Sequence, residues 1–335
     1  MSPHGRAHRR SDRPPTLAIR DLTITLRGRG REGVAVDGIS LEVWPGEIVG
    51  LIGESGSGKT MTALAVLGLL PRAARIAHGD IVLSGRSLRG LPDHQLRTLR
   101  GSRIAMIPQN PTAALNPVLR VGVQVGEPFV LHRRLPWREA LAQAVRRLGD
   151  VHLPAPGDRA REYPHQFSGG MQQRAMTAMA TALEPELLVA DEPTTALDVT
   201  IQAQVLRLLR EIRDVHGTAI LFITHDLGVV AEVCDWVYVM YAGRILETAS
   251  VVELFARPRH PYTQALLRAT PVVESAPTEL LAIPGMIPSP FELPQGCRFA
   301  DRCPLRFPRC DAEPPLLQAE AEHAARCWLV EAAHA

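Results

Sequence analysis

The segment Gly53-Glu-Ser-Gly-Ser-Gly-Lys-Thr60 constrains this chain more than any other stretch. It has the spacing G-x-x-x-x-G-K-[ST], in which glycines let backbone N–H groups close around phosphate oxygens. The apolar run Glu47 to Ile52 precedes it, as a buried parallel strand would. Good helix formers follow from Met61 to Leu70, and Pro71 ends them. A strand, a glycine loop and a helix start together predict an anion site, whereas a flexible glycine–serine turn would not require these neighbours.

Two side chains of this loop have predicted roles. Lys59 is expected to reach the β- and γ-phosphates of a nucleotide, and the Thr60 hydroxyl to bind Mg²⁺. Lys59 is the only lysine in the chain, because every other Lys or Arg position is arginine. A narrow ammonium fits among backbone amides where a planar guanidinium does not.

Composition limits the class of protein. The 335 residues are enough for one large or two modest domains, and the net charge of +2 argues against a strongly basic nucleic-acid surface. No apolar stretch approaches the ~20 residues that span a bilayer. Residues 1–15 are basic without an apolar signal core, so we expect a disordered tail. A cytosolic protein follows, whose five cysteines are not expected to form structural disulfides.

The order of patterns predicts an α/β fold. Residues 16–26 and 34–43 form an expected strand pair joined by a glycine-rich loop. Prolines become frequent after residue 110, and residues 110–185 are expected to be an inserted helical subdomain. The nucleotide-binding domain would extend over residues 16–258, and residues 259–335 would form an irregular, cysteine-rich extension.

Several polar residues directly follow predicted buried strands. Asp191 and Glu192 end the run 187–190, where Asp191 would hold Mg²⁺ and Glu192 would be the base for an attacking water. Gln109 and His225 each follow another strand, where they could contact a metal or a γ-phosphate oxygen. Taken singly, these residues are equally compatible with a turn, a helix cap or a loop. Ser168-Gly-Gly170 opens a helix and is either a second anion site or a cap.

The order of these motifs resembles the ATP-binding cassette of ABC transporters over residues 17–250. The resemblance implies a P-loop NTPase with a RecA-like core, an antiparallel β subdomain and the helical insertion. It also implies a head-to-tail dimer, in which the segment 168–172 serves the ATP of the partner cassette while Lys59, Glu192 and His225 serve this chain's own. Asp198 would lie at the dimer seam.

The resemblance assigns the following residues to sites. ATP would be bound by Gly53, Glu54, Ser55, Gly56, Ser57, Gly58, Lys59, Thr60 and Gln109. Mg²⁺ would be held by Thr60, Gln109 and Asp191, with Glu192 and His225 catalytic. The side acting on the partner would comprise Ser168, Gly169, Gly170 and Gln172. No aromatic residue lies between Thr16 and Val43 to stack on adenine, so Leu26 or Val34 would replace it.

Finer features are similar to the ATPase subunits of oligopeptide and dipeptide importers: residues 108–117, residues 260–267 and the cysteine-bearing tail. This implies a second, different cassette subunit, two transmembrane permeases, an extracytoplasmic peptide-binding protein, and a place on the cytoplasmic face of the membrane. Residues 110–117 would dock a permease helix, the alternative being a rigid connector. Soluble ABC ATPases of ribosomes or DNA carry two cassettes or long coiled coils, which this sequence lacks. A non-catalytic cassette would not keep Glu192 and His225.

The cysteines Cys297, Cys303, Cys310 and Cys327 have the spacing C-x₅-C-x₆-C-x₁₆-C. Nearby arginines would favour the thiolates that a metal requires. Spacing alone leaves zinc, an iron–sulfur cluster and free thiols open. The resemblance selects a [4Fe–4S] cluster, with zinc the lesser alternative, while Cys234 is expected to be a buried structural residue.

Overall fold

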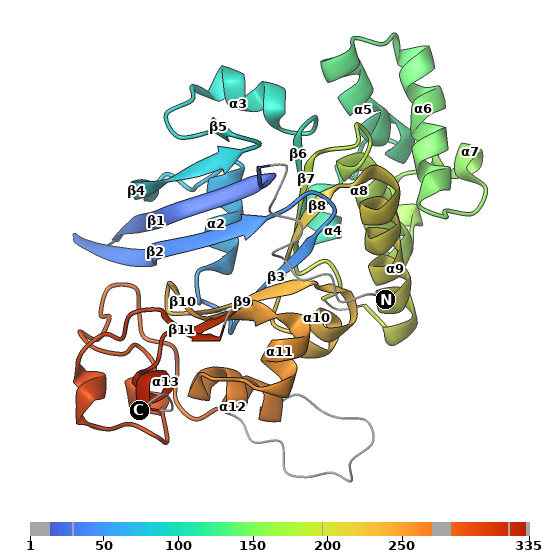
Figure 1. Cartoon of the computed structure of the whole chain (residues 1–335). Helices are drawn as coiled ribbons and strands as arrows, with labels where there is room; N and C mark the ends of the chain where they lie inside the picture. The colour runs from blue at the N-terminus through green and yellow to red at the C-terminus, as the bar shows by residue number, and fades with distance from the viewer. Residues whose placement is uncertain (1–13, 29, 196, 270–282, 321, 333–335) are drawn as a thin grey trace. The chain divides into compact units, whose positions relative to one another are not determined.

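The computed structural model describes residues 14–28, 30–195, 197–269, 283–320 and 322–332 (Figure 1). The tail predicted for residues 1–15 lies outside these residues except for Pro14 and Pro15. The chain divides into two compact units. The helical unit contains residues 14–16, 43–47 and 90–222, and the phosphate-loop unit contains residues 17–42, 48–89 and the described residues from 223 onward.

The phosphate-loop unit contains a four-stranded sheet of order β2-β1-β4-β5. Its strands are β1 (Leu17–Gly28), β2 (Arg31–Val43), β4 (Ala74–Leu83) and β5 (Arg86–Ser87). β1 and β4 pair antiparallel, and the apolar residues of β1 are buried at Leu17, Ile19, Leu22 and Ile24. The strand pair predicted from residues 16–43 is therefore confirmed, with β1 and β2 as sheet neighbours.

The same unit contains a second run of strands in the order β11-β12-β10-β9-β3. These strands are β3 (Ile48–Ile52), β9 (Trp236–Tyr241), β10 (Arg244–Ser250), β11 (Leu317–Glu320) and β12 (His323–Ala325). β3 and β9 pair parallel, and every residue of both strands is buried, as is typical when both faces of a sheet are covered. The remaining neighbours pair antiparallel.

The helices of the phosphate-loop unit include one that follows the loop and several in the C-terminal part of the chain (Figure 1). They are α2 (Lys59–Val66), α10 (Leu227–Val233), α11 (Val251–Ala256), α12 (Pro261–Ala269) and α13 (Trp328–Ala332), with 3₁₀ turns η2 (Ala300–Arg302) and η3 (Pro308–Asp311). The region after residue 258 is thus more regular than its prolines suggested, because β12 pairs with β10 and β11 adds to it.

In the helical unit, β6 (Ile104–Ile107) pairs parallel with β7 (Leu187–Asp191), and β8 (Ala219–Thr224), next to β7, begins in this unit. Its helices are α3 (Asp93–Leu99), α4 (Pro111–Ala114), α5 (Val121–Arg133), α6 (Trp137–Asp150), α7 (Pro156–Arg159), α8 (Gly169–Ala180) and α9 (Val199–His216), with the 3₁₀ turn η1 (Pro164–Gln166). Figure 1 shows α5, α6 and α7 grouped together. No helix in the described residues is long and apolar enough to cross a membrane.

Helix α5 was not predicted, because Gly122, Gly126 and Pro128 interrupt its pattern. A Cβ on Gly122 would lie 2.7 Å from the carbonyl oxygen of Ala160, and one on Gly126 would lie 3.2 Å from that of Ala140. The glycines therefore allow close backbone packing, which compensates for their low helix propensity.

Candidate functional site

The phosphate loop is fixed by steric constraints that only glycine meets. Gly53 has φ +152° and Gly58 φ +110°, in the region that L side chains rarely adopt. A Cβ on Gly53 would collide with the carbonyl oxygen of Met240, and one on Gly58 would lie 2.7 Å from that of Ala35. The local sequence and the surrounding strands thus specify the same loop.

The ammonium of Lys59 lies inside the curve of this loop. Its Nζ donates hydrogen bonds to the carbonyl oxygens of Gly53, at 2.6 Å, and Glu54, at 2.9 Å, and the residue is 5% exposed. Helix α2 begins at Lys59, so its N-terminal partial charge adds to that of the ammonium. Thr60 is exposed at the same helix start. A buried cation in a glycine-lined loop suits a polyphosphate ligand.

His225 belongs to the phosphate-loop unit. It directly follows β8 and is exposed, while Asp226 caps α10 by accepting the N–H of Gly228 at 2.8 Å. The capped helix fixes the backbone on one side of His225 and the strand fixes it on the other. A fixed backbone with an exposed imidazole is what a γ-phosphate contact requires.

In the helical unit the structure brings Gln109 and Glu192 together. The Nε2 of Gln109 donates to Oε2 of Glu192 at 2.9 Å, and Thr195 Oγ1 donates to the same oxygen at 3.0 Å. Glu192 has φ +49°, so the backbone turns sharply directly after β7. Thr195 was missed by sequence reasoning, although its position three residues after Glu192 in a turn was a usable signal. Two donors therefore orient the predicted base.

The residues predicted to hold Mg²⁺ supply oxygen ligands, which this ion prefers. Asp191 ends β7 and is 3% exposed, so its carboxylate is held in a buried position. The amide nitrogen of Gln109 is directed to Glu192, which leaves its carbonyl oxygen for a metal or water. Thr60 lies in the phosphate-loop unit and the other two ligands in the helical unit. Each side chain is chemically suited to the predicted ion.

Residues 168–172 have structural partners within the helical unit. Ser168 caps α8 by accepting the N–H of Met171 at 3.4 Å. A Cβ on Gly170 would lie 2.9 Å from Ile201 Cγ2, so glycine permits α8 to approach α9. The amide of Gln172 donates to the carbonyl oxygen of Pro164 at 2.9 Å. The cap alternative is thus present in the structure, and the role of this segment toward a second cassette stays a prediction.

Asp198 similarly caps α9, because its Oδ1 accepts the N–H of Ile201 at 2.9 Å. The carboxylate is exposed beside the helix start. Gly169 is also exposed, and a Cβ added to it would meet no neighbouring atom within 4 Å. The position of Asp198 at a dimer seam stays a prediction.

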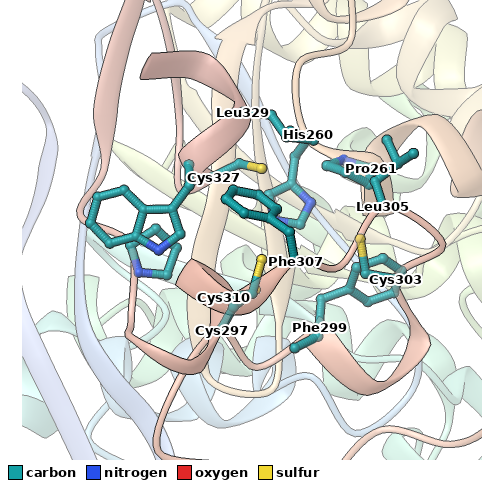
Figure 2. Close-up of a pocket in the computed structure, with 13 residues that line it drawn as sticks. His260, Pro261, Cys297, Phe299, Cys303, Leu305, Phe307, Cys310, Cys327 and Leu329 are labelled. Carbon is teal, nitrogen blue, oxygen red and sulfur yellow. The ribbon is translucent and has the colours of Figure 1, made fainter. Parts of the chain in front are cut away.

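The predicted metal site in the C-terminal region is wrong. Among the described residues, no group of three or more His, Cys, Asp or Glu side chains is arranged to hold a metal ion. The four thiols instead border a cavity of about 10 Å³ lined by Phe299, Leu305, Phe307 and other apolar groups (Figure 2). A space of this size matches at most one water molecule. Neither the [4Fe–4S] cluster nor the zinc alternative has a ligand set here.

Electrostatics explain why the sequence argument for thiolates failed. Burial raises the pKa of Cys297 to about 12 and that of Cys327 to about 11, and it also raises the pKa of Cys303. The neighbouring arginines are directed elsewhere: Arg298 to Asp37, Arg302 to Glu54, Arg306 to Asp301 and Asp311, and Arg309 over the ring of Trp328. The thiols of Cys297, Cys303 and Cys327 are therefore held in the neutral form. Cys234 is 7% exposed, as expected for a structural residue.

An aromatic ring does pack against glycines of β1 and β2, from a distant part of the sequence. Cβ atoms on Gly28 and Gly33 would lie 2.8 Å and 2.7 Å from the ring of Phe291. The Val34 N–H donates to the carbonyl oxygen of Pro290 at 2.8 Å. Leu26 and Val34 are both partly buried. The search for an aromatic within residues 16–43 could not find Phe291, because only folding brings it there.

Comparison with known proteins agrees with this geometry. Residues 36–195 match the ABC transporter family, and residues 246–310 match the oligopeptide/dipeptide transporter C-terminal region. A probable peptide ABC transporter ATP-binding protein of Sinorhizobium fredii is 50% identical over 315 residues, covering 93% of this chain and 94% of that protein. This chain belongs to the ABC transporter family, among the oligopeptide/dipeptide ATP-binding proteins.

Other relatives of this ABC protein carry related names. The oligopeptide transport ATP-binding protein of Salmonella typhimurium is 47% identical over 300 residues, covering 90% of this chain and 89% of the relative. The dipeptide transport ATP-binding protein of Bacillus subtilis is 44% identical over 315 residues, covering 93% and 94%. A solved dimeric ATP-binding cassette in a post-hydrolysis state with ADP and Pi superposes with a TM-score of 0.63 at 25% identity. It covers 70% of this chain and 98% of that one, which confirms the ABC cassette fold.

Proposed function

We propose that this chain is the ATP-binding and ATP-hydrolysing subunit of an ABC importer of oligopeptides or dipeptides. The observation that carries the proposal is the phosphate loop, in which the only lysine of the chain is buried among carbonyl oxygens behind a helix start. The similarity to peptide-transport ATP-binding proteins over more than nine-tenths of the chain supports the transport role.

In this proposal each unit supplies part of the chemistry. Residues 53–60 bind the phosphates, and Lys59 neutralises charge on the β- and γ-phosphates. Mg²⁺, held by Thr60, Gln109 and Asp191, would supply charge neutralisation at the phosphate oxygens. Glu192, oriented by Gln109 and Thr195, accepts a proton from the attacking water. His225 donates to a γ-phosphate oxygen.

The proposal includes partners that couple hydrolysis to transport. A second, different cassette would bring its nucleotide to Ser168, Gly169, Gly170 and Gln172 across a seam that includes Asp198. Two transmembrane permeases would hold the subunit at the cytoplasmic face of the membrane, and an extracytoplasmic binding protein would select the peptide.

The segment that follows Gln109 supports permease docking in this proposal. Val118 is 75% exposed and Leu119 42% exposed, so two apolar side chains face solvent beside α4. The buried side chain of Gln124 holds their backbone, because it bonds both the N–H and the carbonyl of Asn116 and the carbonyl of Leu119. A rigid exposed apolar surface suits contact with a permease helix.

The single lysine permits a direct test of the nucleotide site. The full chain is treated with trinitrobenzene sulfonate, and modification of Lys59 is quantified by peptide mass mapping. We expect saturating MgATP to slow modification at least about tenfold, because the phosphates would cover the ammonium. AMP, which lacks β- and γ-phosphates, is the control and should leave the rate unchanged.

A variant of the same residue tests its role in hydrolysis. Lys59→Ala should lose about 10²–10³ in ATPase rate, as expected when a preorganised charge partner of the phosphates is removed. Equal modification rates of the parent chain with MgATP and with AMP would contradict the proposed site.

A further inference from the structure

The C-terminal region contacts the phosphate loop at Glu54 from two sides. This residue is unusual chemically, because a carboxylate in a phosphate-binding loop repels the anion that the loop should bind. Its Oε2 lies 3.0 Å from Nη1 of Arg302, and its backbone N–H donates to the hydroxyl of Tyr262 at 2.9 Å. The Nζ of Lys59 donates to its carbonyl oxygen at 2.9 Å. Both the charge and the backbone of Glu54 are therefore held.

Arg302 is itself tightly fixed and 6% exposed. Its Nε donates to the carbonyl oxygen of Pro284 at 2.8 Å, its Nη2 to that of Ile283 at 3.2 Å, and its Nη1 to the hydroxyl of Tyr241 at 3.2 Å. Several fixed hydrogen bonds on one guanidinium leave it little freedom to follow a moving carboxylate. Movement of Glu54 would break an ion pair rather than carry Arg302 with it.

Tyr262 is equally fixed and fully buried. Its ring lies 4.7 Å from that of Tyr241 and 5.3 Å from that of Phe299, measured between centroids. Burial raises the pKa of the Tyr262 hydroxyl, so the group stays neutral at physiological pH. The rigid aromatic cluster holds the hydroxyl oxygen of Tyr262 in place, and this oxygen accepts the hydrogen bond from the Glu54 N–H. The bond fixes the backbone at the second position of the loop.

A second connection reaches the loop through the turn between β9 and β10. Arg298, buried in the C-terminal region, donates to the carbonyl oxygen of Ala242 and pairs with Asp37. The adjacent Gly243 donates its N–H to the carbonyl oxygen of Ser57 at 2.8 Å. One arginine of the C-terminal region thus contacts the loop directly, and a second is linked to the loop through this turn.

We propose that Arg302 and Tyr262 are positioning residues for nucleotide binding: Arg302 neutralises Glu54, and Tyr262 fixes the loop backbone. The proposal rests on the proposed binding of MgATP by residues 53–60 and goes beyond it, because it makes nucleotide affinity depend on the C-terminal region. The two contacts act on different parts of Glu54. Arg302 acts on the side-chain charge, and Tyr262 acts on the backbone N–H.

This difference gives a test with an internal contrast. MgATP affinity is measured by calorimetry on the full chain for Arg302→Met, Glu54→Gln, Tyr262→Phe and the combinations of Glu54→Gln with each of the other two. Arg302→Met should bind MgATP about tenfold more weakly, the size typical for losing one charge-assisted hydrogen bond. Adding Glu54→Gln should return the affinity to within about threefold of the parent, because no charge is left uncompensated.

Tyr262→Phe should also weaken binding about tenfold, because the partly buried N–H of Glu54 loses its acceptor. Here Glu54→Gln should not restore affinity, because the lost bond belongs to the backbone. The matched control is Arg306→Met, whose exposed guanidinium pairs only with Asp301 and Asp311 in the described residues, and it should stay within about twofold of the parent.

Thermal unfolding without nucleotide separates affinity from folding, since a purely structural role would lower stability without rescue by Glu54→Gln. If Arg302→Met does not fold, Glu54→Gln alone supplies the test: with the carboxylate removed, nothing is left to repel the phosphates, and the affinity should equal or exceed that of the parent. Affinity of Arg302→Met within twofold of the parent, equal weakness of Arg302→Met and its double variant, or a tenfold loss in Glu54→Gln would overturn the proposal. A parent chain that does not bind MgATP would instead refute the proposed function.

Discussion

His260 makes the stability of the C-terminal region sensitive to acid. The residue is 1% exposed, and burial lowers its pKa from 6.5 to about 4, although the charge of Glu247 opposes the shift. Its Nδ1 accepts the N–H of Tyr262 at 3.0 Å, so protonation of that nitrogen would remove an acceptor. The folded chain therefore keeps this imidazole neutral.

The sign and size of the effect follow from linkage. The unfolded imidazole binds a proton below pH 6.5 and the folded one only near pH 4, so the stabilisation is present above pH 6.5 and is lost as pH falls toward 4. Between pH 7.5 and pH 5.0 this group alone should lower the free energy of unfolding by about 2 kcal/mol. Other charged groups, Glu247 and Arg326, lie beside this imidazole, so the comparison needs a variant that changes only His260.

His260→Asn serves, because the amide oxygen can accept the Tyr262 N–H but does not titrate. Urea unfolding is followed by tryptophan fluorescence at pH 7.5 and pH 5.0, with Trp236 and Trp328 reporting from the same unit as His260. The free energy of unfolding should be lower for the variant than for the parent at pH 7.5, and this gap between the two should narrow by about 2 kcal/mol at pH 5.0. His94→Asn, at an exposed position of α3, should leave no gap at either pH. An identical gap for His260→Asn at both pH values would refute the reasoning.

Three further predictions concern catalysis, coupling and packing. Glu192→Gln keeps the shape of the side chain but removes the base, so ATP turnover should fall roughly 10²–10⁴-fold with MgATP binding retained, and near-normal turnover would exclude its role. Asn116→Glu should reduce peptide transport in vesicles more than the ATPase of the isolated subunit, whereas equal losses would favour a rigid connector. Gly33→Ala places a Cβ 2.8 Å from the carbonyl oxygen of Pro290 and should destabilise by about 1–3 kcal/mol in urea unfolding. Gly149→Ala places a Cβ 3.9 Å from Pro156 Cγ, so it should instead stabilise α6 by about 0.5–1 kcal/mol. A lower free energy of unfolding for Gly149→Ala would show that helix propensity does not determine stability at this position.

The parts of this protein that the sequence determined by itself are those encoded in neighbouring residues. Eight consecutive residues specify the phosphate loop, because glycine is the only residue that adopts its backbone angles without strain. The buried strands β3 and β7 are readable as short apolar runs. Asp191 and Glu192 could be selected because they directly follow such a strand.

Tertiary structure alone decided the features that join distant segments. Helix α5 forms despite Gly122 and Gly126 because they pack against Ala160 and Ala140, a contact without a local signal. Phe291 reaches Gly28 and Gly33, and Arg302 reaches Glu54, across more than two hundred residues. The cysteines show the same limit: the sequence places arginines near the thiols, but folding directs the guanidiniums to carboxylates, carbonyl oxygens and an aromatic ring. Burial, which raises the pKa of a thiol, is set by the whole packed region and not by the residues beside it.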